Sequence, residues 1–358
     1  MSATIGPRGT TRRPLGTVSV EQVSLAHGGG GRAMRDLIDD VFVRSFDNPL
    51  LAPLEDQARV PLGTLIAHGD RLAVTTDSYV VDPLFFPGGD IGKLAVCGTV
   101  NDLAVGGAKP LYLTCGIIIE EGLAMATLRR VAQSMAEAAR EAGVSIVTGD
   151  TKVVPRGACD KLFVNTTGVG VIRADLELGA HGARPGDVVI VSGTIGDHGA
   201  TIMGSRADLA LDSSIRSDCA ALHGIAEALI ATCAGLRFMR DATRGGIATV
   251  LNEIAAASHV GVEIDETKLP ILPEVRGLCE ILGLDPIYLA NEGKLIAVVP
   301  PEEAERAIAA LNDHTLGRAG ATIGTITDAK PGRVVMRSVL GGKRIVDMLS
   351  GEQLPRIC

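Results

Sequence analysis

Short apolar runs alternate with helical spacings of apolar residues along the first half of the chain. Four runs rich in Val, Ile, Leu and Thr predict strands at 72–76, 111–119, 144–148 and 162–172. Two helices are predicted between them, a tightly packed one at 91–105 and an amphipathic one at 128–139 that ends at Gly143. This alternation is typical of a domain that combines a sheet with helices.

A second series of strands and helices follows a cluster of Gly and Pro at 179–186. Its predicted strands are 187–192, 262–264, 295–299 and 321–326, and its predicted helices are 244–258 and 302–311. Both series end on similar strands of small residues, at 166–171 and 321–326. This weak repeat favours an α+β fold with two α/β domains side by side over a TIM barrel.

The expected organisation has four parts. Residues 1–20 carry arginines but no acid and no apolar segment, which predicts a disordered leader rather than a signal peptide. We expect one domain at 21–178, a second at 179–338, and a mobile tail at 339–358.

The composition narrows the functional classes. Hydrophobic residues make up 46% of the chain, while Trp is absent and aromatic residues are scarce, which suits a small-molecule enzyme. The net charge of −8 argues against nucleic-acid binding, which needs clustered Lys and Arg. Because the chain has no run of about 18 apolar residues, no membrane span is expected. Seven cysteines without a C-x-x-C pair or zinc spacing predict a reduced, cytoplasmic protein.

The chain ends on a cysteine, Cys358, at the close of a short tail over 351–358. A thiol on a free chain end can be carried into an active site, and Pro355 stiffens its approach. With seven cysteines in 358 residues, a cysteine stands at the last position by chance in about 2% of cases. The rest of the chain therefore has to decide whether Cys358 is functional.

Four aspartates in the first domain lie where predicted elements end or turn. Asp77 follows a strand, Asp102 lies in Val100-Asn101-Asp102-Leu103, Asp150 follows the 144–148 strand, and Asp56 precedes them all. Carboxylates at strand ends can converge on one edge of a sheet, and Mg²⁺ binds carboxylate and phosphate oxygens together. The set therefore suits a magnesium–nucleotide site, although each aspartate alone also fits a turn or a helix cap.

Two places combine glycines with the start of a predicted helix. The run His27-Gly28-Gly29-Gly30-Gly31 precedes one helix, and Asp241 and Arg244 stand at the start of the 244–258 helix. Backbone N–H groups at such places bind anions, so both are candidate phosphate sites. The glycine run lacks the G-K-[ST] ending of a Walker A loop and also fits a flexible hinge. An ordinary Asp N-cap explains the second place equally well.

Two candidate bases lie beside turns. Glu292, in Asn291-Glu292-Gly293-Lys294, could remove protons or form a solvated pair with Lys294. Lys152 closely follows Asp150 and could contact phosphate, or act as a base if burial removes its charge.

Eight segments match one known pattern of residues. They are 27–31, 83–93, 100–103, 147–157, 192–199, 239–246, 289–294 and the terminal Pro355-Arg356-Ile357-Cys358. Together they resemble the HypE family of hydrogenase maturation proteins, in the superfamily of aminoimidazole ribonucleotide synthetase and selenophosphate synthetase. The resemblance runs from about residue 20 to the terminus, and the terminal tetrapeptide is its specific part. Two departures are the missing Ser among the glycines and Ala242 where the family usually has Pro.

The resemblance implies a specific reaction. A partner carbamoyltransferase would load a carboxamide onto Cys358, and the protein would use ATP to dehydrate it to a thiocyanate. The cyano group would then pass to an iron-carrying maturation complex of the HypC–HypD type and become a ligand of a [NiFe] hydrogenase centre. A homodimer formed through the sheet of the N-terminal domain is also implied.

The resemblance further implies roles for individual residues. Glu292 and Lys152 would remove the two N–H protons of the carboxamide on Cys358. The ligands of Mg²⁺ and its nucleotide would be Asp56, Asp77, Asp102 and Asp150. Further contacts to ATP would come from His27, Gly28, Gly29, Gly30, Gly31, Lys93, Asn101, Thr148, Gly149, Thr151, Asp241 and Arg244.

Two other functional classes remain open from the sequence. One is a small-molecule ATP-dependent synthase or kinase of the same superfamily, with Cys358 incidental. The other is a non-catalytic carrier whose tail thiol ferries a ligand or metal. The state of the thiol is also open, because Arg356 should lower the pKa of Cys358 while its own α-carboxylate should raise it.

Overall fold

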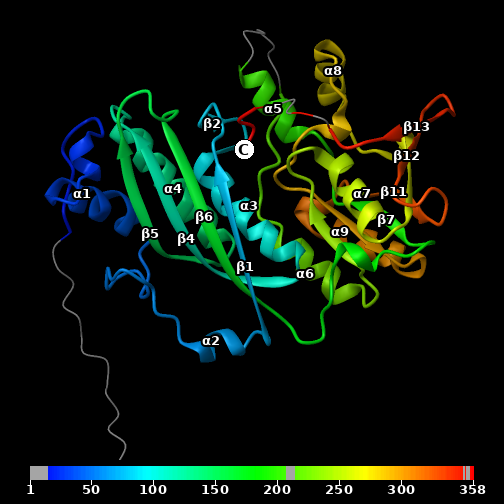
Figure 1. Ribbon diagram of the computed structural model, residues 1–358, viewed down its shortest axis with the longest axis horizontal. Coiled ribbons are helices and arrows are strands. Elements are labelled where there is room, and N and C mark those ends of the chain that lie inside the picture. The colour runs from blue at the N-terminus through cyan, green and yellow to red at the C-terminus, as the bar shows by residue number, and fades with distance from the viewer. Residues whose placement is uncertain (1–14, 207–213, 350, 352–354) are drawn as a thin grey trace, which may run out of the picture.

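The structure of the protein is a computed structural model that describes residues 15–206, 214–349, 351 and 355–358. The expected leader at 1–20 lies mostly outside these residues. The described chain forms two halves, each a sheet packed against helices (Figure 1). This arrangement confirms the predicted α+β fold with two α/β units.

The first half is built on a four-stranded sheet in the order β1–β6–β4–β5. Its strands are β1 (Arg71–Tyr79), β4 (Ala108–Glu120), β5 (Ser145–Val154) and β6 (Leu162–Ile172). Helices α3 (Ile91–Val105) and α4 (Met125–Glu141) cover one face of this sheet (Figure 1). Alternate β4 side chains are buried on the covered face, as the period of two in a strand requires: Leu113, Cys115, Ile117 and Ile119.

The second half is built on a seven-stranded sheet in the order β13–β12–β9–β11–β7–β10–β8. Its strands are β7 (Val188–Val191), β8 (Phe238–Asp241), β9 (Gly261–Asp265), β10 (Leu295–Val299), β11 (Ala321–Thr327), β12 (Val334–Arg337) and β13 (Lys343–Val346). Its helices are α5 (Asp197–Arg206), α6 (His223–Thr232), α7 (Gly246–Ala257), α8 (Pro273–Leu282) and α9 (Ala304–Asp313). Strand β10 lies inside the sheet with every residue buried, which explains its unbroken apolar sequence.

Short elements complete the described chain. Near the start, η1 (Leu25–Gly28) precedes α1 (Arg32–Leu37), which continues into the π-helical η2 (Ile38–Val43). The others are α2 (Leu62–Ile66), β2 (Phe85–Phe86), β3 (Gly89–Asp90), η3 (Ala180–Gly182), η4 (Glu266–Lys268), η5 (Pro286–Tyr288), η6 (Pro301–Glu303) and η7 (Thr315–Gly317). None of the helices in the described ranges has both the length and the apolar content needed to cross a membrane.

The predicted strands and helices are confirmed, with three differences. Strands β1 and β5 continue to Tyr79 and Val154, so Asp77 and Asp150 lie inside these strands and not after them, as predicted. The helix expected at 244–258 begins at Gly246, because Gly245 and Gly246 adopt left-handed φ angles of 78° and 60° that form a turn. Part of the tail expected at 339–358 is folded, because β13 pairs with β12 at the edge of the second sheet.

The N-terminal core gives a direct test of the fold. Leu113 is fully buried in the centre of β4, so Leu113→Ala should lower the free energy of unfolding by about 2–5 kcal/mol. Leu340 is 97% exposed, so Leu340→Ala should change it by less than about 0.5 kcal/mol. Denaturant unfolding of both variants checks the difference, and equal effects would contradict the described packing.

Candidate functional site

The end of the tail is hydrogen-bonded to the chain just past the first sheet. Past the end of β1, the N–H of Val80 donates to a terminal carboxylate oxygen of Cys358 at 3.1 Å. The N–H of Asp82 donates to the carbonyl oxygen of Arg356 at 3.3 Å. The Ile357 side chain is buried in the N-terminal core, with 4% exposed. Main-chain pairing and one apolar anchor thus place the C-terminus between the two halves (Figure 1).

Two arginines fix the approach of the tail. Arg206, the last residue of α5, donates to the carbonyl oxygens of Asp82 and Pro355 at 2.6 Å each, and also to that of Arg356. The Arg356 guanidinium pairs with Asp82 at 3.3 Å and with Asp160. Two carboxylates, rather than the tail thiol, therefore match the charge of Arg356.

The Cys358 thiol faces a group of acids. Burial raises the pKa of Cys358 well above its ordinary value, and Glu292 raises it further through its charge and a hydrogen bond. Asp77 acts in the same direction, whereas the Arg244 guanidinium lowers this pKa. The cation that favours the thiolate is therefore Arg244, in place of the expected Arg356.

Glu292 is a buried carboxyl group whose own turn gives it no cation. Glu292 is 2% exposed, and its Oε1 atom has no hydrogen-bond partner among the described residues. Burial raises the pKa of Glu292 well above its ordinary value, and the charges of Asp218 and Asp241 add to this. The alternative of a solvated pair with Lys294 is wrong, because Lys294 Nζ pairs with Asp218 Oδ2 at 3.2 Å. A carboxyl group in such surroundings takes up a proton readily, as a general base must.

Hydrogen bonds hold the Glu292 turn from both sides. The buried Asp218 carboxylate accepts from the N–H groups of Glu292 at 3.0 Å and Gly293 at 3.1 Å. The Asn101 amide of α3 donates to the carbonyl oxygens of Ala220 at 3.1 Å and Glu292 at 3.5 Å. A Cβ on Gly293 would lie 1.9 Å from the Asp218 carbonyl oxygen, so only glycine permits this approach. Asn101 therefore anchors the turn, and its nucleotide contact stays a prediction.

Further acids surround the end of the tail. Asp102 of α3 accepts from Thr75 Oγ1 at 2.8 Å, and burial and the charge of Asp77 raise the pKa of Asp102. Burial raises the pKa of Asp241 to about 7, with Asp102 and Asp77 adding to the effect. The Arg244 guanidinium lies 3.9 Å from Asp77. A cation would relieve the repulsion among the carboxylates of Asp77, Asp102 and Asp241. These carboxylates therefore fit Mg²⁺, which takes one or two carboxylates besides phosphate and water.

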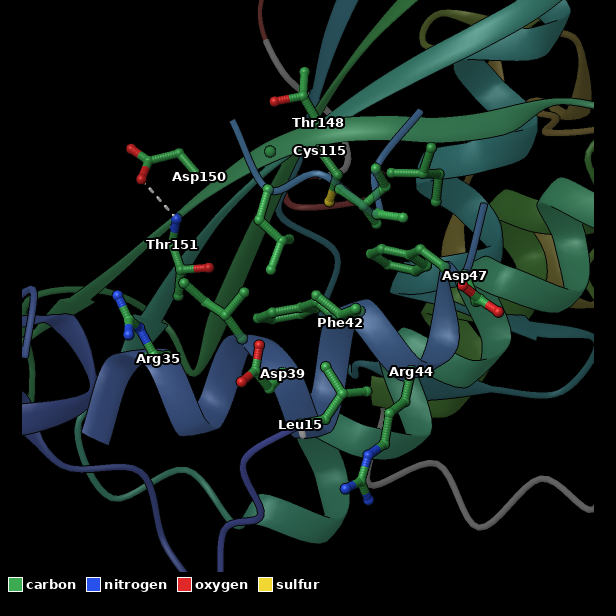
Figure 2. Close-up of a pocket in the computed structure, with 18 of the residues that line it drawn as sticks. Leu15, Arg35, Asp39, Phe42, Arg44, Asp47, Cys115, Thr148, Asp150 and Thr151 are labelled. Atoms are coloured by element: carbon green, nitrogen blue, oxygen red, sulfur yellow. Dashed lines mark hydrogen bonds between the residues drawn. The ribbon is translucent and has the colours of Figure 1, made fainter. Parts of the chain in front are cut away.

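A cavity of about 1180 Å³ lies at the other edge of the first sheet (Figure 2). The glycine run and the middle of β5 both line it, through Gly30, Gly31, Thr148, Gly149, Asp150 and Thr151. Apolar side chains such as Phe42 line the same cavity (Figure 2). The structure therefore brings two of the predicted phosphate-binding segments together beside an apolar wall.

The remaining predicted contacts have structural partners. His27 is buried, and its Nδ1 accepts from the Ser24 N–H at 3.0 Å, which fixes the turn before the glycines. A Cβ on Gly28 would lie 2.7 Å from the β5 backbone, whereas the structure leaves open space at Gly30 and Gly31. Lys93 lies elsewhere, at the start of α3, where its Nζ is 3.3 Å from the Gly88 carbonyl oxygen.

The expectation that the four aspartates converge is wrong for a single chain. Asp77 and Asp102 lie beside the tail, whereas Asp150 lies at the cavity and pairs with Lys152 at 2.8 Å. Asp56 lies in an exposed segment before α2. The cause is topological, because β1 and β5 are the two outer strands of the sheet. Within the described ranges, no three His, Cys, Asp or Glu side chains form a metal-binding group.

Comparisons with known proteins agree along almost the whole chain. Residues 55–172 match the family described as AIR synthase related protein, N-terminal domain, and residues 184–337 match its C-terminal domain. The carbamoyl dehydratase HypE of Rhodobacter capsulatus is 59% identical over 338 residues, which cover 94% of this chain and 98% of the relative. The chain belongs to the HypE family of carbamoyl dehydratases.

Solved HypE structures share this fold. The crystal structure of a HypE protein in complex with ATP has a TM-score of 0.89 and 52% identity, covering 94% of this chain and 99% of the other. A HypE chain in a HypE–HypF complex has a TM-score of 0.76 and 45% identity, covering 89% and 100%. Both belong to the HypE family in which this chain is placed.

Sequence reasoning missed residues that hold the site together. His198 lies in the segment 192–199, which resembles the HypE family, but nothing in the sequence pattern indicates a role for this histidine. Asp218 and Arg206 stand in no motif, and they contact residues 74 and 150 positions away. Such contacts leave no periodic signal in the sequence, because the fold alone brings the partners together.

The link between Glu292 and the thiol is testable by alkylation. Glu292→Gln removes a charge and a hydrogen bond that raise the pKa of Cys358, so this pKa should fall toward its ordinary value. More thiolate then forms at a given pH, and iodoacetamide should alkylate Cys358 roughly threefold or more faster at pH 8. The exposed Glu302 supplies the matched control, Glu302→Gln, with an unchanged rate. An unmoved pH profile in Glu292→Gln would contradict the described contact.

Proposed function

We propose that the protein uses ATP to dehydrate a carboxamide carried on its own Cys358, giving a thiocyanate for [NiFe] hydrogenase maturation. The observation that carries the proposal is the docked tail, whose terminal thiol meets the buried carboxyl group of Glu292. Membership of the HypE family of carbamoyl dehydratases supports the same reaction.

The proposed reaction has two steps. The amide oxygen of Cys358–S–C(=O)–NH₂ attacks the γ-phosphorus of ATP, ADP leaves, and one N–H proton is lost, giving Cys358–S–C(OPO₃²⁻)=NH. Loss of the second N–H proton then forms the C≡N bond as phosphate departs with the former amide oxygen. The products are Cys358–S–C≡N, ADP, phosphate and a proton. Phosphorylation is required because an amide oxygen is a poor leaving group.

Glu292 is the proposed base beside the carboxamide nitrogen. Its buried position and raised pKa suit proton uptake in a cleft from which the docked tail excludes water. Lys152 is the second proposed base, but in a single chain it lies on β5 and pairs with Asp150. We therefore propose that Lys152 of one copy acts as the second base on the tail of the other copy.

The proposed homodimer forms through the uncovered face of the first sheet. Leu72 and Val74 of β1 are 60% and 62% exposed, and Ile118 of β4 is 42% exposed. Lys152 pairs in register with Ile118, so its side chain lies on the same face. A sheet face with such apolar exposure is typical of an interaction surface. Pairing two such faces would bring the cavity side of one copy toward the tail side of the other.

ATP has a proposed site that extends from the cavity of one copy to the tail side of the other copy in the proposed dimer. The glycine run and 148–151 would hold one end of the nucleotide, and Arg244 and Asp241 would flank the phosphates. Asp77 and Asp102 of one copy would hold Mg²⁺, with Asp56 and Asp150 of the other copy completing the set from its cavity side. The ion, when bound, would neutralise the charge of the phosphates.

Two partners complete the proposal. A carbamoyltransferase would load the tail, as the HypE–HypF complex of a relative supports. An iron-carrying complex of the HypC–HypD type would accept the cyano group. We place the reaction in the cytoplasm, because all seven cysteines are free thiols, as in a reducing compartment.

The mass of the tail tests this function. Full-length protein is incubated with the carbamoyltransferase, carbamoyl phosphate and ATP, with and without Mg²⁺, and the C-terminal peptide is weighed. An adduct of about +43 Da on Cys358 should become one of about +25 Da only with Mg-ATP. Cys358→Ser, with the hydroxyl in place of the thiol, should not yield the +25 Da product.

The two alternative functions give other outcomes. A non-catalytic carrier would keep the carboxamide adduct of about +43 Da, and adding Mg-ATP would not change its mass. A small-molecule synthase or kinase would leave the tail unmodified and consume ATP with a free substrate even after 355–358 is deleted. Either result would overturn the proposed dehydration.

The dimer surface gives a separate prediction. Val74→Asp places a charge on the exposed apolar face and should convert the protein to monomers in sedimentation velocity. Leu340→Asp, at a highly exposed position in the other half, should sediment like the wild type. A Val74→Asp variant that sediments with the mass of the wild type would place the interface elsewhere.

A further inference from the structure

We propose that His198 is a positioning residue, which holds the Ile357 carbonyl group and so sets Cys358 against Glu292. The inference rests on the proposed role of Cys358 as acceptor. His198 lies in the first turn of α5 and is fully buried. Its Nε2 is 2.8 Å from the Ile357 carbonyl oxygen, and its Nδ1 is 2.8 Å from Ser217 Oγ.

The hydrogen bonds define the tautomer of His198. The Ile357 carbonyl oxygen can only accept, so Nε2 carries the proton and donates. Nδ1 is then an acceptor, and the Ser217 hydroxyl donates to it while accepting from the Cys219 N–H at 3.1 Å. Burial lowers the pKa of His198, which keeps the ring neutral as this pattern requires. Three bonds in series thus point a single donor at the tail.

The ring itself cannot shift easily. Phe86 packs edge-on against His198, with ring centroids 5.4 Å apart and an interplanar angle of 83°. The ring is therefore oriented by both packing and the Ser217 hydroxyl. A fixed donor costs less conformational entropy on docking than a free side chain would.

The three terminal carbonyl groups have different partners. Those of Arg356 and Cys358 accept from the chain beyond β1, and Arg206 also reaches Arg356. The Ile357 carbonyl has His198 as its donor and is one residue from the reacting cysteine. His198 and Arg206 stand at opposite ends of α5, so this one helix grips the tail at two points. Without His198, the last peptide group would be buried without its donor.

The test uses full-length protein with the pre-carbamoylated tail and Mg-ATP in single turnovers. In His198→Ala, conversion to the thiocyanate should slow about tenfold, as expected for a buried acceptor left unpaired. The KM for ATP should stay unchanged, because His198 lies outside the proposed nucleotide contacts. In a separate assay on the unloaded protein, whose Cys358 is a free thiol, iodoacetamide should alkylate Cys358 of His198→Ala about tenfold faster than that of the wild type, because the tail leaves its bound position more often.

His198→Gln is the conservative variant, since its amide can donate from the position of Nε2. It should recover most of the conversion and most of the protection from alkylation. His314→Ala, which removes a histidine beside α9, should match the wild type in both assays. Ser217→Ala should lie between wild type and His198→Ala, because it frees the tautomer but keeps the ring.

Two results would overturn the inference. One is wild-type alkylation of Cys358 in a folded His198→Ala, and the other is a folded His198→Gln as impaired as the alanine variant. If His198→Ala does not fold, the alkylation and conversion rates of His198→Gln and Ser217→Ala are compared with those of the wild type to test the inference. Alkylation does not depend on the dehydration reaction. If the proposed function is wrong, conversion to the thiocyanate fails in the wild type, whereas if His198 does not hold the tail, alkylation of His198→Ala matches the wild type.

Discussion

The functional site depends on the hydrogen bonds between the chain end and the segment that follows β1. Val80 and Asp82 present N–H groups just past β1, and the burial of Ile357 anchors the tail at the junction of the two halves. This pairing, with the contacts from His198 and Arg206, brings Cys358, the last residue, to Glu292, which precedes β10 in the other half. The reacting group and its proposed base thus come from separate parts of the chain, so the tail must bind in this position before chemistry can begin.

The second constraint on the site is the arrangement of charged side chains around the Glu292 carboxyl group. Asp218 accepts from the backbone of the Glu292 turn and also pairs with Lys294. The nearest lysine in sequence is therefore committed to holding the turn, and the Glu292 carboxyl group stays buried with a raised pKa. Burial makes Glu292 a stronger base, and the same carboxylate that holds the turn adds to this effect through its charge.

Much of the fold could be predicted from the sequence, because the apolar periodicity of each strand and helix is a local property. The structure brings the glycine run and the residues around Thr148, which lie in β5, together at one cavity, and their wide separation in the chain gave no sign of this. The partner of Lys294 could not, because Asp218 lies far away in the chain and stands in no motif. The aspartates were separated by strand order, which puts β1 and β5 on opposite edges and which no spacing reveals.

The central claim is that Glu292 is a buried base with an elevated pKa beside the docked thiol. The most direct measurement is a pH titration of the full-length protein with ¹³C-labelled Glu carboxyl groups by NMR, with Glu292→Gln assigning the resonance. The account predicts a midpoint well above the ordinary value of about 4.3 and a lower midpoint in Asp218→Asn. A midpoint near the ordinary value, unchanged by Asp218→Asn, would contradict it.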